Sequence, residues 1–258
     1  MNIFKQLVKS IYSPKDISIF RFQGIGKTIL YVFLLTLISI IPSMYFLSTA
    51  ITEGVHSAKE TVASKLPDFE INNGKLESDS NKPLTITENG FVMVFDSSGE
   101  AKASDLDQVE NGVALLKNEM VFVANGDTQS YSYSMLEDLT LNKKDLVNLI
   151  DSIDSSLVIF LPILILANYI LSLGVKFIEI SILAALGLII KNITLRKLNY
   201  GQLWRMSAYS VTLTTIFFTV MAALKTSVPG DFLLNWMVSY FVLFLAVKEI
   251  PQAKKSDS

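Results

Sequence analysis

Four polar side chains within a long apolar run are the residues of this chain best placed to do chemistry. Lys176 and Glu179 are three positions apart, so on a helix they are neighbours on one face. Tyr169 and Ser172 precede Lys176 by seven and four positions and fall on the same face. Charges inside a membrane are costly and usually face a bundle interior or a water-filled cavity. The pattern fits a polar pocket or relay, a self-neutralising pair that joins helices, or a pair at the membrane surface.

The residue types that most enzymes use are scarce in this sequence. There is no cysteine, and His56 is the only histidine, so disulfides, thiolate catalysis and cysteine zinc sites are excluded. "GIGKT" at 24–28 resembles the end of a phosphate-binding loop, but Arg21 stands where that loop needs its first glycine. No metalloprotease, hydrolase or kinase signature is present. We therefore expect no catalytic residue, no cofactor, no metal and no nucleic-acid partner.

The apolar residues are gathered into runs long enough to cross a membrane. Hydrophobic residues make up 50% of the chain, and its mean hydropathy is +0.43. Residues 28–50 contain no charge, and a helix of that length crosses a hydrocarbon core of about 30 Å. Residues 206–224 and 232–248 are further candidates, and 156–190 is a longer run. The lipid bilayer is therefore an expected partner.

Acidic and basic residues are sorted to different parts of the chain. Residues 51–155 contain 19 Asp and Glu against 8 Lys, a net charge of −11. The rest contains 14 Lys and Arg against 5 Asp and Glu. Basic loops tend to stay in the cytoplasm, so this asymmetry places the N-terminus inside and residues 51–155 outside the cell membrane. Residues 3–12 have the spacing of a short amphipathic helix on the membrane surface.

The acidic segment 51–155 has the pattern of a small β-rich domain. Asn73-Gly74 joins two short alternating runs and predicts a hairpin turn, because this dipeptide adopts positive φ readily. Asn89-Gly90 predicts a second hairpin, and Ser98-Gly99 the next turn. Residues 111–134 add three more short strands. The predicted fold class is an α+β membrane protein, with a helical bundle and a β-rich extracytoplasmic domain inserted after the first span.

The run 156–190 can form one span or two. As two spans, the second would have about 14 residues, fewer than the usual minimum of roughly 17, and the turn at 174–176 would be very tight. The basic segment 191–205 would then lie outside, against the charge rule. If the run 156–190 forms one span, the basic segment 191–205 lies in the cytoplasm. We therefore expect four spans, with five as the alternative.

The expected chain order follows from these choices. A cytoplasmic segment and a first span lead to the acidic domain, and a long second span leads to a basic loop. Two more spans and a cytoplasmic tail complete the chain. The boundaries are 1–27, 28–50, 51–155, 156–190, 191–205, 206–224, 232–248 and 249–258.

Several stretches together resemble one protein family. They are "SPKDISIFRFQGIGKTILYVFLL", "PDFEINNGKLES", "VFDSSG", "NGVALLKNEMV" and "YSYSMLEDLTLNKKDL". They resemble an uncharacterised family of membrane proteins from Gram-positive bacteria, a domain-of-unknown-function family. Some of its members carry the label maltodextrin-utilisation protein, of the YvdJ type. The resemblance covers nearly the whole chain and implies no catalytic residue. Its label implies at most an association with a sugar-uptake system.

These observations give two functional expectations. The first is a non-enzymatic membrane protein of accessory, sensory or regulatory type, whose outer domain binds a ligand or a partner such as another membrane protein or a transporter. The alternative is a component of a sugar-transport system that uses an intramembrane polar stripe. The candidate site in either case is the set Tyr169, Ser172, Lys176 and Glu179.

Overall fold

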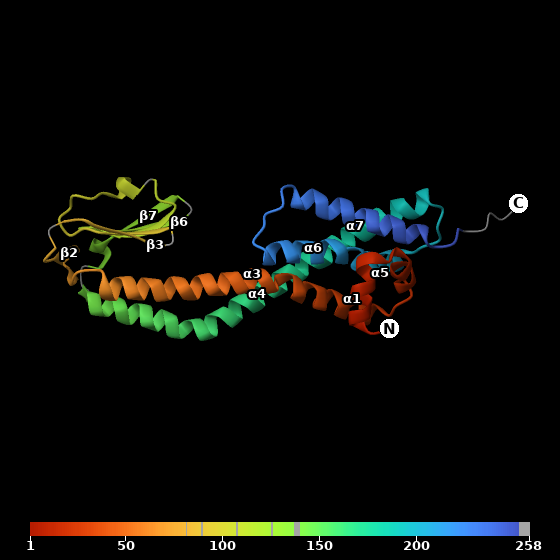
Figure 1. Ribbon diagram of the computed structural model, residues 1–258, viewed down its shortest axis with the longest axis horizontal. Helices are drawn as coiled ribbons and strands as arrows, with labels where there is room; N and C mark the ends of the chain where they lie inside the picture. Colours follow the sequence, from red (N-terminus) through yellow and green to blue (C-terminus); the bar gives the residue numbers. More distant parts are fainter. Residues whose placement is uncertain (81, 89, 107, 125, 137–139, 253–258) are drawn as a thin grey trace, which may run out of the picture. The chain divides into compact units, whose positions relative to one another are not determined.

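The protein divides into two compact units that share two long helices (Figure 1). The computed structural model describes residues 1–80, 82–88, 90–106, 108–124, 126–136 and 140–252. We call residues 1–49 and 159–258 the helical unit, and residues 50–158 the β unit. Helix α3 (Ile25–Ser64) and helix α4 (Lys143–Ile193) each contribute residues to both units.

The helical unit contains five further helices. They are α1 (Ile3–Tyr12), α2 (Pro14–Phe20), α5 (Tyr200–Ser210), α6 (Thr212–Ala223) and α7 (Asp231–Lys248). Asn199 begins α5 with a capping box, in which its side chain accepts from the Gln202 amide and the Gln202 side chain accepts from the Asn199 amide. Buried apolar side chains from α2, α3, α4, α5 and α7 form one core.

Four helical stretches among the described residues are long and apolar enough to cross a membrane. They are α3, α4, the run Tyr200–Ala223 that joins α5 and α6, and α7. Residues 174–176, where a turn would divide the run 156–190, lie inside α4 with no interruption. In the most apolar window of α4 no residue is buried by protein, so this stretch offers an apolar surface to its surroundings.

The N-terminal helix α1 has exposed apolar and buried polar side chains. Phe4 and Val8 are 61% and 53% exposed, as the predicted helix on the membrane surface would present them to lipid, while Gln6 is buried. Gln6 Nε2 donates to Gln23 Oε1 at 2.7 Å, and Gln23 Nε2 donates to the Tyr209 hydroxyl at 2.7 Å. Paired amides therefore help to hold α1 against the other helices, because buried amides need partners.

The β unit contains two sheets (Figure 1). A three-stranded sheet has the order β2-β1-β8, and a five-stranded sheet has the order β3-β4-β5-β6-β7. Two short 3-10 helices, η1 (Ala103–Leu106) and η2 (Tyr133–Leu136), lie between strands. The strands are β1 (Phe69–Asn72), β2 (Lys75–Ser78), β3 (Leu84–Glu88), β4 (Phe91–Phe95), β5 (Asn111–Leu115), β6 (Glu119–Ala124), β7 (Asp127–Ser132) and β8 (Leu141–Asn142).

The two faces of the five-stranded sheet are covered by different elements. Phe95 and Leu115 on one face belong to a core that includes Val62 near the end of α3 and Leu66 just after it. On the other face Val121 belongs to a core closed by the connection between β4 and β5. The β unit therefore packs its sheet against the ends of the shared helices on one side and against its own chain on the other.

The turn chemistry of the sequence is confirmed at the first hairpin. Asn73 and Gly74 adopt φ of 50° and 73° between β1 and β2, as this turn type requires. Strands β3 and β4 pair antiparallel as expected, although Asn89 of their predicted turn lies outside the described residues. Gly99 has positive φ, but no hairpin follows it, because β4 and β5 are parallel. The parallel pairing requires the long connection that the sequence pattern does not reveal.

Asp96 organises the start of that connection. Its buried carboxylate accepts from the backbone amides of Ser98 at 2.8 Å, Gly99 at 3.1 Å and Ala101 at 2.7 Å. Burial acts to raise the pKa of Asp96, but the hydrogen bonds from Ser98, Ala101 and Gly99 outweigh it and hold the pKa below its ordinary value. The charged carboxylate therefore fixes the loop that closes one face of the sheet.

Replacing this carboxylate is expected to open the loop. Asp96→Ala should reduce the local opening free energy by about 2–3 kcal/mol, because three amides lose a charged acceptor. Amide hydrogen exchange at residues 98–101 of the full chain should then become about 30- to 150-fold faster. In the unchanged chain the stabilisation should be complete above about pH 4 and decline as the pH falls toward the depressed pKa.

Asp105→Ala is the matched control, because Asp105 caps a single exposed amide, that of Lys102, at 2.8 Å. Equal exchange at residues 98–101 in the Asp96→Ala variant and in the unchanged chain would contradict the role given to Asp96.

Candidate functional site

Lys176 and Glu179 form an ion pair between the helices of the helical unit. Lys176 Nζ lies 2.7 Å from Glu179 Oε2, and the two side chains are 15% and 10% exposed. The lysine also donates to Thr215 Oγ1 of α6 at 3.2 Å. The other carboxylate oxygen, Glu179 Oε1, accepts from Asn235 Nδ2 of α7 at 2.7 Å. The pair therefore connects α4 to both α6 and α7.

Helix α4 has room for its neighbours' side chains beyond the ion pair. Gly187, two turns beyond Glu179, faces Leu203 of α5 and Leu243 of α7. A Cβ added at Gly187 would stand 3.1 Å and 3.3 Å from their Cδ2 atoms, closer than an ordinary contact. The missing side chain thus leaves space for these two leucines.

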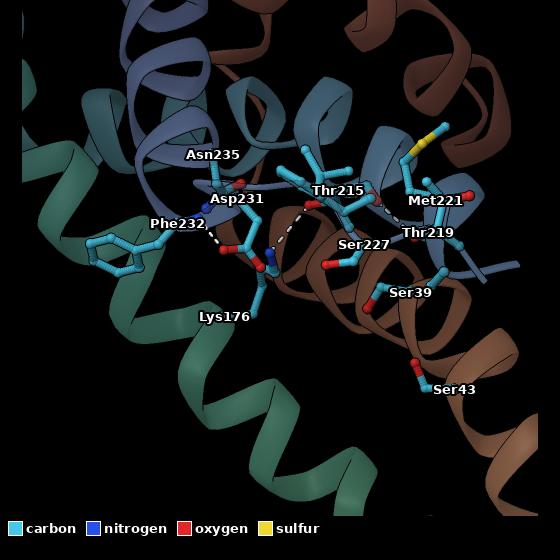
Figure 2. Close-up of a pocket in the computed structure, with 14 residues that line it drawn as sticks. Ser39, Ser43, Lys176, Thr215, Thr219, Met221, Ser227, Asp231, Phe232 and Asn235 are labelled. Carbon is cyan, nitrogen blue, oxygen red and sulfur yellow. Dashed lines mark hydrogen bonds between the residues drawn. The ribbon is translucent and has the colours of Figure 1, made fainter. Parts of the chain in front are cut away.

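A polar cavity of about 520 Å³ lies beside the pair (Figure 2). Lys176 reaches into it from α4, and the other walls come from α3, α6, α7 and the α6–α7 link. Figure 2 shows the ammonium of Lys176 directed toward Thr215. The polar side chains of the lining are those of Ser39, Ser43, Lys176, Thr215, Thr219, Thr226, Ser227, Asp231 and Asn235.

The arrangement suits binding better than bond making. An ammonium group has three donors, and Glu179 and Thr215 use two of those of Lys176. The third donor, together with hydroxyl and amide groups, can hold a small polar molecule. The charge of Lys176 is neutralised by Glu179, so it is a weak candidate for an activated nucleophile or base. Among the described residues no group of three His, Cys, Asp or Glu side chains is placed to hold a metal.

The structure brings together two of the four residues that the sequence predicted as a site. Tyr169 donates its hydroxyl to the Phe33 carbonyl of α3 at 3.0 Å. Ser172 donates to Asn168 Oδ1 at 3.4 Å, within its own helix. Neither residue bonds to Lys176 or Glu179. The predicted stripe therefore consists of the Lys176–Glu179 ion pair and two residues, Tyr169 and Ser172, that make other contacts.

Thr215 and Asn235 complete the centre, and neither was predicted as part of it. Thr215 belongs to the Ser- and Thr-rich run of the third apolar segment, a pattern that usually serves helix packing. Asn235 is a single amide in the apolar run "FLLNWMV". An isolated amide in such a run needs a polar partner, so Asn235 itself indicated a polar contact. The spacing of the sequence could not show that Glu179 is that partner.

Comparison with known proteins identifies the family. A family model described as a protein of unknown function (DUF1189) matches residues 4–247. The chain belongs to this family. The match begins in α1 and ends in α7, so the DUF1189 pattern includes both the helical unit and the β unit. The resemblance to an uncharacterised family is thereby confirmed. No curated protein and no solved structure matches the chain.

Breaking the ion pair on one side is expected to destabilise the helical unit. Lys176→Leu should lower its free energy of unfolding by about 3–5 kcal/mol, because Glu179 would remain charged and buried without its partner. The double variant Lys176→Leu/Glu179→Leu should cost less than the single change. The fluorescence of Trp204 and Trp236, the only tryptophans, reports this unit, since both lie within it.

Ser172→Ala is the control for this series and should change the free energy by less than about 0.5 kcal/mol, because its hydroxyl makes one weak contact. A double variant as unstable as the sum of both single changes would show that the two charges do not depend on each other.

Proposed function

We propose that the protein is a multi-pass protein of the cell membrane whose outer unit senses a ligand or partner and regulates the helical unit. In this arrangement four spans cross the bilayer, both termini are cytoplasmic, and residues 51–155 lie outside. The four long apolar helices support it, as do the net charge of −11 in residues 51–155 and the basic remainder of the chain. The uncovered apolar surface of α4 supports it too, because lipid would bury that surface.

The shared helices carry the regulatory part of the proposal. Helix α3 contributes Ser39 and Ser43 to the polar cavity, and α4 contributes Lys176. The same two helices continue into the β unit, where Lys59 of α3 pairs with Asp151 of α4 at 2.5 Å. Ligand binding that favoured one arrangement of α3 and α4 in the β unit would also favour one arrangement of the cavity walls. Such coupling requires no catalytic residue.

A transport component is the second candidate, and the polar cavity is the observation that favours it. A cavity of about 520 Å³, whose lining includes hydroxyl, amide and charged groups beside apolar side chains, has the size of a small-molecule site. The resemblance to a maltodextrin-utilisation protein of Gram-positive bacteria would associate it with sugar uptake. In that case Lys176→Leu/Glu179→Leu should abolish chain-dependent uptake of labelled maltodextrin, whereas unchanged uptake would exclude the pair from transport.

A cross-link within the β unit tests the coupling without knowledge of the ligand. The chain has no cysteine, so Lys59→Cys/Asp151→Cys can be joined by a short bifunctional maleimide in the full chain. If α3 and α4 transmit a constraint, amide hydrogen exchange at the α6–α7 link, residues 224–230, should change by about fivefold or more.

The same variant treated with a monofunctional maleimide provides the control, because it carries equal modification without the link. Exchange at residues 224–230 that is identical in the two samples would argue against regulation through these helices.

A further inference from the structure

A second cavity, of about 490 Å³, lies entirely within the β unit. One wall is the final third of α3, and the other is the edge of the five-stranded sheet formed by β3 and β4. We call it the α3–β4 groove. Its walls include Gly54 and Ala58 on the helix and Ile86, Phe91 and Met93 on the sheet. These side chains give the groove an apolar floor.

The groove is open because the helix presents small residues along one side. Ala50, Gly54 and Ala58 recur at intervals of four, so they lie on one face of α3. A Cβ added at Gly54 would have no atom within 4 Å. Opposite, Phe91 is 44% exposed although it is a large apolar side chain. With Ile86 and Met93 the ring forms a continuous apolar lining, and an exposed apolar patch bordered by polar residues is typical of a binding surface.

Carboxylates border this apolar surface. Glu53 lies in the groove wall and is exposed, and it forms no salt bridge with any described residue. Glu88 also lies in the wall and is paired with Lys65, whose hydrogen bond is the main cause that holds the pKa of Glu88 below its ordinary value. Glu88 is therefore expected to be charged near neutral pH, and Glu53 adds a second carboxylate to the groove within a segment of net charge −11.

We propose that the α3–β4 groove binds a cationic amphipathic peptide, with its apolar side chains against Phe91 and Met93 and a lysine or arginine at Glu53. A peptide of this kind is recognised by an apolar groove with charges at its border. Anionic lipids and a second copy of the acidic β unit would both be repelled by the same charges. The idea that this peptide is the signal sensed by the outer unit rests on the proposed function. The binding of the peptide to the groove does not.

Direct binding to the full chain in nanodiscs of zwitterionic lipid tests the proposal. The probe is a fluorescent 14-residue peptide of Leu and Lys arranged as an amphipathic helix, with empty nanodiscs as the blank. A peptide of the same length and pattern with Glu in place of Lys tests charge, and decanoate tests an anionic amphiphile. The unchanged protein should bind only the Leu/Lys peptide, and more weakly as salt is added.

Two variants locate the binding in the groove. Gly54→Trp fills open volume and should weaken binding by about tenfold or more, while Glu53→Lys should weaken it by about fivefold or more through like-charge repulsion. Glu60→Lys is the matched control, because it makes the same change of charge at an exposed glutamate of α3 outside the groove lining, and it should bind like the unchanged chain.

The outcomes separate this proposal from the regulatory one. Unchanged affinity in both Gly54→Trp and Glu53→Lys, or equal binding of the Glu peptide or decanoate, would overturn the groove assignment and leave the cross-link result untouched. If Gly54→Trp alters the circular dichroism spectrum, Glu53→Lys alone decides, because it changes only an exposed side chain.

Discussion

A charge between tightly packed helices must find a partner, and the architecture of the helical unit depends on how Lys176 and Glu179 meet this requirement. Each charge is satisfied twice, once by the other and once by a neutral side chain, Thr215 for the lysine and Asn235 for the glutamate. Three helices are thereby joined at one point. Lys176 also adds an N–H donor to the adjacent cavity, and its charge is balanced by Glu179.

Two helices give the molecule its organisation. Because α3 and α4 belong to both units, the chain passes between the units within helices. At about 1.5 Å per residue, the 51 residues of α4 measure about 76 Å, far more than a hydrocarbon core of about 30 Å. In the proposed arrangement part of α4 therefore extends beyond the bilayer. Leu146 and Ile150, near its N-terminal end, pack against the β-unit core.

Local patterns predicted the elements of this protein better than their partners. Apolar runs located the long helices, and Asn73-Gly74 located a hairpin, because helix period and turn chemistry act within a few residues. The parallel pairing of β4 and β5 joins strands whose connection contains Asp96 and η1, and no local signal specifies it. The same limit applies to the site: the spacing of Lys176 and Glu179 predicted a neighbouring pair, whereas Asn235 reaches it only through packing of α7 on α4.

In the proposed arrangement the run 156–190, which contains Lys176 and Glu179, crosses the membrane once. Single cysteines in this cysteine-free chain, at Glu100, Lys197 and Gln252, can be labelled on intact cells with a membrane-impermeant maleimide. With four spans, labelling is expected at position 100 alone, with positions 197 and 252 reactive only after the membrane is opened. Labelling of 197 and 252 on intact cells would instead divide the run 156–190 into two spans and contradict the four-span arrangement.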